Sequence, residues 1–142
     1  MPPPHTIVDG QALPSLAPVG ALFHKLSGAL PEYEVEPRVL LEGNGYIKGC
    51  KVVHTTALSP TDAEGIIEIL LNDNSYGDRG MGSRCFFPGF AFTFGATAEQ
   101  AHVQVCLECS WVVFHTAAGS QSFVPSPTGE ARLKAVYERL IA

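Results

Sequence analysis

The sequence predicts an α+β domain with a mainly antiparallel sheet of about four or five strands and helices packed on one face. Two helix-start signals, Ser59-Pro60 and Ser126-Pro127, are each followed by apolar residues at three- and four-residue spacing. Between them, residues 85–114 contain two apolar segments that alternate in polarity and are typical of a β-hairpin. Hairpins separated from helices in this way favour an antiparallel sheet over a parallel one.

The N-terminal part of the chain divides at about residue 17. Residues 1–17 are rich in proline and lack periodicity, which predicts an extended, mobile arm without a core of its own, followed by a single domain over 18–142. The next segment predicts a short amphipathic helix over residues 19–30, because its apolar residues recur at helical spacing. These residues are Val19, Leu22, Phe23, Leu26 and Leu30.

Two strands are expected next, over residues 34–42 and 46–58. They flank Gly43-Asn44-Gly45, whose residue types tolerate the positive φ angles that a tight hairpin turn requires. Ser59 then offers a side-chain cap and Pro60 a preset φ, so a helix is expected to begin here. The buried stripe of that helix is expected to be Ile66, Ile67, Leu70 and Leu71.

The remaining connections and the last helix follow from composition. Residues 72–84 are rich in Gly, Asn and Asp and have no periodicity, which predicts an exposed loop. Residues 75–84 lack apolar anchors, so this part is expected to be mobile. The C-terminal helix is expected after Ser126-Pro127. Its buried positions are expected to be Leu133, Val136, Tyr137 and Leu140.

The second hairpin strand has one apolar and one polar face, because neighbouring side chains of a strand point in opposite directions. The apolar face comprises Val103, Val105, Leu107, Cys109, Trp111 and Val113. The polar face comprises His102, Gln104, Cys106, Glu108 and Ser110. We therefore expect Trp111 and Cys109 to be buried against a helix. Phe90, Phe92 and Phe94 are expected to match the apolar face from the first strand.

The same parity places Cys85 beside Cys106 on the polar face, if the first strand is regular through Pro88. With His102 and Glu108, these thiols offer sulfur, nitrogen and oxygen ligands that suit Zn or Cu. Cys109 is either a packing residue or a further ligand, since a C-x-x-C pair in a regular strand diverges. Cys50 is expected to lie outside this site. Zn or Cu is thus the possible cofactor, and the default expectation is that no cofactor is bound.

Composition limits the classes of partner. The net charge is −5 and the chain has only nine Lys and Arg residues, which excludes the clustered basic surface that nucleic acids and anionic membranes require. No apolar run approaches the roughly 20 residues of a membrane span. The N-terminus has no basic segment followed by an apolar one, so we expect a cytoplasmic protein with reduced thiols.

The cysteine hairpin resembles a known pattern. Residues Cys85-Phe86-Phe87-Pro88-Gly89-Phe90-Ala91-Phe92, with Cys106-Leu107-Glu108-Cys109, are similar to a small bacterial family of uncharacterised proteins. That family has C-[FY]-x-P-x-H-G-[IF] followed by C-[FL]-x-C. The resemblance implies a mixed α/β fold and no settled activity. Phe90 stands where the family often has His, so a site using that imidazole does not carry over.

The function expected from the sequence is that of a non-enzymatic binding or accessory protein. The chain lacks the G-x-S-x-G, P-loop, G-x-G-x-x-G and H-E-x-x-H motifs, and its charged content is only 16%. A low surface charge and an aromatic hairpin favour contact with a protein partner or a second copy of the chain. The alternative is a thiolate-based metal-binding or redox protein that uses Cys85, Cys106 and Cys109.

Overall fold

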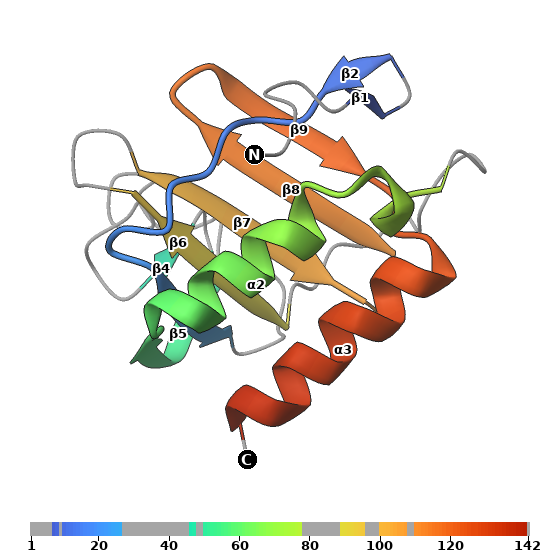
Figure 1. Cartoon of the computed structure of the whole chain (residues 1–142). Helices are drawn as coiled ribbons and strands as arrows, with labels where there is room; N and C mark the ends of the chain where they lie inside the picture. The colour runs from blue at the N-terminus through green and yellow to red at the C-terminus, as the bar shows by residue number, and fades with distance from the viewer. Residues whose placement is uncertain are drawn as a thin grey trace.

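The computed structural model describes residues 7–8, 10–26, 46–47, 50–77, 89–95, 100–107 and 110–141. In chain order its elements are β1 (Ile7–Val8), β2 (Gln11–Ala12), β3 (Leu22–Leu26), β4 (Tyr46–Ile47), β5 (Cys50–Ala57), α2 (Pro60–Leu70), η1 (Asp73–Ser75), β6 (Phe90–Phe94), β7 (Ala101–Cys106), β8 (Trp111–Thr116), β9 (Gly119–Phe123) and α3 (Pro127–Ile141). Helices α2 and α3 lie on the same face of one large sheet (Figure 1). The fold is α+β, as the sequence predicts.

The sheet is larger than expected. Its described strands number seven, in the order β4-β5-β3-β6-β7-β8-β9, and each neighbouring pair is antiparallel. Strands β6 to β9 form a continuous meander, and β3 lies between β5 and β6. A separate two-stranded ribbon, β1-β2, precedes the sheet.

The helix expected over residues 19–30 is wrong, because Leu22–Leu26 form strand β3. Phe23 packs in the core under the helices, whereas His24 and Leu26 are buried on the opposite face of the sheet. A strand that is buried on both faces has no simple alternation of apolar and polar residues. Its apolar residues therefore had the three- and four-residue spacing of a helix.

The matching of the phenylalanine strand to its neighbour is confirmed. Phe90 pairs with Val105 and Phe92 with Val103 in the β6–β7 ladder. All of these side chains are buried in the main core, between the sheet and the two helices. Phe23 of β3 extends this core, with its ring centroid 5.8 Å from that of Phe92.

Both helices begin where the sequence predicts. The Asp62 backbone N–H donates to Ser59 Oγ (3.1 Å) at the start of α2, and the Gly129 N–H donates to Ser126 Oγ (3.0 Å) at the start of α3. These hydroxyl groups satisfy backbone donors that have no partner within the helix. Arg139 Nη1, near the end of α3, is 3.0 Å from Asp62 Oδ1 of α2, which joins the two helices at the surface.

The buried stripes of the helices are narrower than expected. Ile66 and Leu70 of α2 are fully buried, and so is Leu133 of α3, with Val136 close behind. Ile67, Leu71, Tyr137 and Leu140 are only partly buried and pack against the edge of the core.

The expected burial of Trp111 is wrong. The segment expected to be one long strand is two, β7 and β8, separated by a turn in which Ser110 has a φ of 59°. The turn changes the parity, so Val112 and Phe114 enter the core while Trp111 is half-buried on the other face. Cys106 pairs with Trp111 across this turn. Cys109, which was expected beside Trp111, lies outside the described residues.

Two segments expected to be unanchored contribute to packing. Val8 and Leu13, from the proline-rich N-terminal segment, are 7% and 4% exposed and belong to the main core. Ser75 and Tyr76, at the start of the expected mobile loop, are also buried. Tyr76 Oη donates to the Leu70 carbonyl (2.6 Å), which ties this connection to the end of α2.

Other predictions fall partly outside the described residues. The expected strand over 46–58 appears as β4 and β5, which pair with each other, and β5 also pairs with β3. Its expected partner strand over 34–42, the turn over 43–45 and the remainder of the loop over 78–84 lie outside the described part of the chain.

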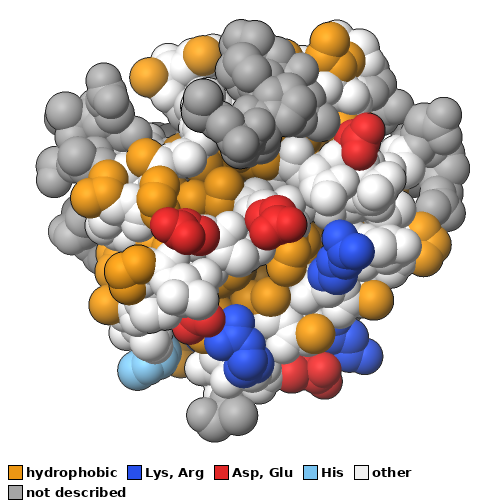
Figure 2. All heavy atoms as spheres, viewed as in Figure 1, with side chains coloured by type: hydrophobic (Ala, Val, Ile, Leu, Met, Phe, Trp, Pro, Cys, Tyr) orange, Lys and Arg blue, Asp and Glu red, His pale blue; other side chains and the backbone are white. Residues whose placement is uncertain are grey.

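The surface over the helices carries dispersed charges. Acidic and basic side chains alternate on this face, and hydrophobic surface is visible between them (Figure 2). In the described part of the chain, no helix combines the length and the apolar character needed to cross a membrane.

Candidate functional site

The structure describes two of the five predicted site residues, His102 and Cys106. Both lie on β7 and share the face opposite α2 and α3, which is called the helix-free face below. Cys85, Glu108 and Cys109 lie outside the described residues, so the five-residue set stays a prediction. Among the residues described, no group of three or more His, Cys, Asp or Glu side chains is arranged to hold a metal ion.

His102 belongs to a row of hydrogen-bonded side chains that crosses four neighbouring strands, β5, β3, β6 and β7. His24 Nδ1 lies 2.8 Å from Thr55 Oγ1, and His24 Nε2 lies 2.8 Å from Thr93 Oγ1. Thr93 Oγ1 is also 2.8 Å from His102 Nδ1. A hydroxyl group donates only one hydrogen, so Thr93 donates to one imidazole and accepts from the other. The row therefore has two alternative directions, which differ in the tautomers of both histidines.

The row holds His24 in its neutral form at neutral pH. Burial lowers the pKa of His24 from 6.5 to about 4, and the neighbouring His102 contributes in the same direction. His24 is only 6% exposed, and a buried imidazole loses hydration when it becomes charged. Protonation would make both ring nitrogens donors, so Thr55 and Thr93 would both have to accept from His24, which neither direction of the row allows.

Cys50, which was expected to lie outside the predicted site, is on the same face of the sheet. It packs with Leu26 and Ala91 in a small buried cluster. Gln104 Nε2 donates to Cys50 Sγ (3.3 Å). Burial raises the pKa of Cys50 to about 11, the hydrogen bond from Gln104 opposes this, and nearby Cys106 adds to it.

Gln104 connects this thiol to the edge of the sheet. Its Oε1 lies 2.6 Å from His115 Nε2, which therefore carries the hydrogen and donates. His115 Nδ1, 2.8 Å from Ser120 Oγ, then accepts from the hydroxyl when the ring is neutral. This second row runs from buried Cys50 to exposed Ser120.

The chemistry of the helix-free face follows from these partners. Its imidazole His24 is neutral and its thiol Cys50 is protonated at neutral pH, so neither is activated as a charged acid or as a thiolate nucleophile. The interior members are buried, whereas Thr55 and Ser120 at the outer ends are exposed. A layer in which each buried group has a partner rigidifies the sheet.

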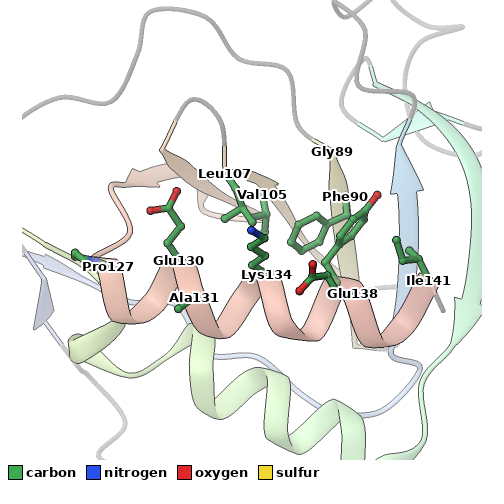
Figure 3. Close-up of a pocket in the computed structure, with 11 residues that line it drawn as sticks. Gly89, Phe90, Val105, Leu107, Pro127, Glu130, Ala131, Lys134, Glu138 and Ile141 are labelled. Carbon is green, nitrogen blue, oxygen red and sulfur yellow. The ribbon is translucent and has the colours of Figure 1, made fainter.

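A second site, the α3 groove, lies where α3 passes the ends of β6 and β7. It has a volume of about 830 Å³ and an open mouth (Figure 3). It is lined by Gly89, Phe90, Val105, Leu107, Pro127, Glu130, Ala131, Lys134, Tyr137, Glu138 and Ile141. The groove thus combines apolar strand ends with one face of a helix.

The two sides of the groove differ in character. Phe90 and Tyr137 stack with ring centroids 4.8 Å apart and an interplanar angle of 26°, which joins the strand side to the helix. Glu130, Lys134 and Glu138 rise from α3 into the groove (Figure 3). An apolar base with a few charged groups at its edge is typical of a binding surface.

The α3 groove is not among the sites expected from the sequence. Phe90 was expected only in the core, and the apolar positions of α3 were expected to form one buried stripe. The available signal was the row Glu130, Lys134 and Glu138 at four-residue spacing, which puts alternating charges on one side of the helix beside exposed Ala131. Only the packing of α3 on the sheet shows that this side meets the ends of two strands.

The chain matches no protein-family model, and comparison with curated proteins and with solved structures likewise finds no match.

Proposed function

We propose that the protein is a non-enzymatic binding or accessory protein that acts by contact with another polypeptide, and that the α3 groove is the contact surface. The observation that supports this most is the groove itself, a hollow of about 830 Å³ that runs beside a helix and is bordered by partly exposed apolar side chains.

The composition of the groove suits a protein contact. Ile141 is 44% exposed, and Leu107 and Tyr137 are partly exposed, so a partner would remove their apolar surface from water. Glu130 and Lys134 border this surface with charge. An apolar centre inside a polar rim is the usual arrangement of a protein interface.

Ala131 allows the groove to be blocked without disturbing the core. It is exposed and lines the groove, so Ala131→Arg would place a long side chain across the binding surface while keeping a good helix former. Ala135 is exposed one turn further along α3 and is not one of the described lining residues. Ala135→Arg is therefore a matched control with the same charge and the same helix.

The experiment is a selection of random displayed peptides on the wild-type protein, followed by measurement of each peptide on both variants. We expect selected peptides to bind the wild-type protein and Ala135→Arg equally and to lose at least about tenfold in affinity on Ala131→Arg. Peptides that bind all three proteins equally would place the contact elsewhere. A selection that yields no peptide would contradict the proposed function.

A second copy of the chain is the other partner of this class. Sedimentation of the three proteins separates it from a different partner, because Ala131→Arg would then dissociate an oligomer that Ala135→Arg retains.

The alternative proposal is thiol-based metal binding or redox chemistry by Cys85, Cys106 and Cys109. The observation that favours it is that Cys50 and Cys106 lie close together on the helix-free face, where Cys106 contributes to the raised pKa of Cys50. A metal would have to displace the proton of each thiol that binds it, since thiolates are the ligands. Stoichiometric Zn or Cu in protein purified without a metal-affinity tag would support this alternative. Metal-free protein with four free thiols would contradict it.

A further inference from the structure

The outer end of the second row, on the helix-free face, has the arrangement of an activated hydroxyl group. Ser120 Oγ lies 2.8 Å from His115 Nδ1, and His115 Nε2 lies 2.6 Å from Gln104 Oε1. The amide oxygen can only accept, so the neutral ring carries its hydrogen on Nε2 and turns the lone pair of Nδ1 toward the hydroxyl group. A nucleophile, a base and a group that orients the base are related in this way.

The backbone of the β8–β9 hairpin sets the contact between hydroxyl group and ring. The two-residue turn over 117–118 closes on the pair Thr116 and Gly119. Hydrogen-bonded and non-hydrogen-bonded pairs alternate along an antiparallel ladder, so the next pair, His115 and Ser120, is non-hydrogen-bonded. The Cα atoms of such a pair are only about 4.5 Å apart, and their side chains are close. Two strands therefore position the reacting groups, and no loop is needed.

Gln104 holds the ring in place from inside the sheet. It lies on β7 and is 2% exposed. Its Nε2 donates to Cys50 Sγ (3.3 Å), which determines that the amide oxygen is the end that faces His115. A buried polar group with partners at both ends keeps one orientation. Gln104 is thus a positioning residue, since it acts on the hydroxyl group only through the imidazole.

The exposure of the pair permits proton transfer. A neutral base becomes charged when it takes a proton, and water stabilises that charge at a position that is not fully buried. His115 is partly exposed and Ser120 is exposed. After proton transfer Nε2 still donates to Gln104 and Nδ1 donates to the serine oxygen, so the ring keeps both hydrogen bonds.

The pair His24 and Thr55 has the same separation without this property. Its ring nitrogen and hydroxyl oxygen are also 2.8 Å apart. Burial lowers the pKa of His24 to about 4, which makes this imidazole a weak base. Thr55 is therefore an internal comparison, an exposed hydroxyl group beside an imidazole that does not take its proton.

The hairpin also supplies a donor for the oxygen that becomes negative when an acyl group is attacked. In a non-hydrogen-bonded pair the backbone N–H of Ser120 points away from β8, toward the outer edge of β9, the last strand of the described sheet. The N–H of the nucleophilic serine has this role in serine hydrolases, together with a second donor. Removal of one such donor lowers the rate by about 10²–10³. The acyl donor must therefore carry a good leaving group.

We propose that Ser120 accepts an acyl group from an activated ester, with His115 as the base and Gln104 as the positioning residue. Ser120 Oγ forms a bond to the carbonyl carbon, and its proton passes to His115 Nδ1. The bond from that carbon to the leaving oxygen then breaks, the leaving group departs with the electron pair as its anion, and His115 releases the proton to water. The product is an ester of Ser120. This modification goes beyond the proposed function and is independent of it, because the α3 groove lies on the other face of the sheet.

The test treats the full chain with p-nitrophenyl acetate, followed by an acid quench and location of the acetyl group by peptide mass spectrometry. Ser122 is the matched control, because it is exposed on the same strand and face but pairs with Val113. We expect one acetylated serine per chain, Ser120, in the wild-type protein and in Ser122→Ala. We expect Ser122 and Thr55 to react at least about tenfold more slowly.

Two variants test the roles of the base and of the positioning residue. His115→Gln keeps a polar side chain beside Ser120 without a base, and we expect at least about tenfold slower acetylation of Ser120. Gln104→Met keeps the length of the side chain without the acceptor. We expect it to slow acetylation and also to remove the preference of His115 for the Nε2-protonated tautomer in ¹⁵N NMR spectra. A residue with a packing role alone would leave that tautomer unchanged.

The outcomes decide the proposal even if Gln104→Met fails to fold, since His115→Gln changes a partly exposed position. Acetylation of Ser120 and Ser122 at equal rates would overturn it. So would an unchanged rate at Ser120 in His115→Gln, or a wild-type protein in which Ser120 is not acetylated. Each of these results leaves the contact at the α3 groove to its own test with Ala131→Arg.

Discussion

The buried imidazole of His24 makes the stability of the protein depend on pH in a defined window. The folded protein holds the pKa of His24 at about 4, whereas the ordinary pKa of a histidine side chain is 6.5. Folding therefore disfavours the protonated form, and the unfolded chain binds more protons between these two values. The contribution is fully present above pH 6.5, is lost progressively as the pH falls toward 4, and changes no further below that.

The magnitude follows from the difference between the two pKa values. A shift from 6.5 to about 4 corresponds to roughly 3 kcal/mol, at about 1.4 kcal/mol per pH unit. His24 is 6% exposed, so solvent screening reduces this little. We expect the wild-type protein to lose about this much unfolding free energy between pH 7 and pH 4, in addition to the contribution of carboxyl groups.

Urea unfolding followed by circular dichroism, at closely spaced pH values, measures this loss. His24→Gln keeps polar atoms that can reach Thr55 and Thr93 but cannot be protonated, so its stability should fall less over the same window. His54→Gln is the control, because His54 is exposed on β5. The reasoning is refuted if the wild-type protein and His24→Gln lose stability in parallel, or if the His24 ring titrates near 6.5 in NMR spectra of the folded protein.

Two further predictions concern packing and thiol reactivity. A Cβ on Gly129 would clash with the backbone carbonyl of Ser75, so Gly129→Ala should destabilise the protein by about 3 kcal/mol or more. A Cβ on Gly65 meets open space, so Gly65→Ala should stabilise α2 by roughly 0.5–1 kcal/mol. Thermal unfolding of both variants checks this, and equal effects would contradict it. Cys50 and Cys106 are 3% and 1% exposed, so at pH 7.5 a thiol reagent should modify them only after urea is added. Rapid labelling of either in native protein, located by peptide mass spectrometry, would be the opposite result.

The parts of the fold that local chemistry determines could be predicted from the sequence. A hydroxyl cap followed by proline identified the start of α2 at Ser59 because both act within a few residues. Parity predicted that Phe90 and Phe92 share a face with Val103 and Val105, whereas the register that pairs them was left open by the sequence and is given by the structure.

The errors arose where a distant segment or a backbone conformation decided the outcome. Strand β3 is buried on both faces because β5 and β6 flank it and the helices cover Phe23, none of which its own spacing reveals. Trp111 changed face because Ser110 adopts a left-handed φ of 59° without a glycine, proline or asparagine in the turn to signal it. One unrecognised turn reverses every later side chain of the strand.

The site was predictable to a similar extent. His102 and Cys106 share a face, as strand parity requires, but the approach of Cys50 and His24 depends on the order of strands in the sheet. The α3 groove depends on how one helix crosses the ends of two strands. The four-residue spacing of Glu130, Lys134 and Glu138 predicts a charged row on one side of α3. It does not indicate which strand ends lie opposite that row.

The most direct test of the central claim is a map of amide NMR shifts in the full-length protein as a peptide from the displayed-peptide selection is added. We predict saturable changes concentrated at Leu107, Ala131, Lys134 and Glu138, which line the groove, and little change at exposed β5 residues such as Thr55. Changes centred on β5 or on the helix-free face would contradict the account. So would spectra that remain unchanged with every peptide from the selection.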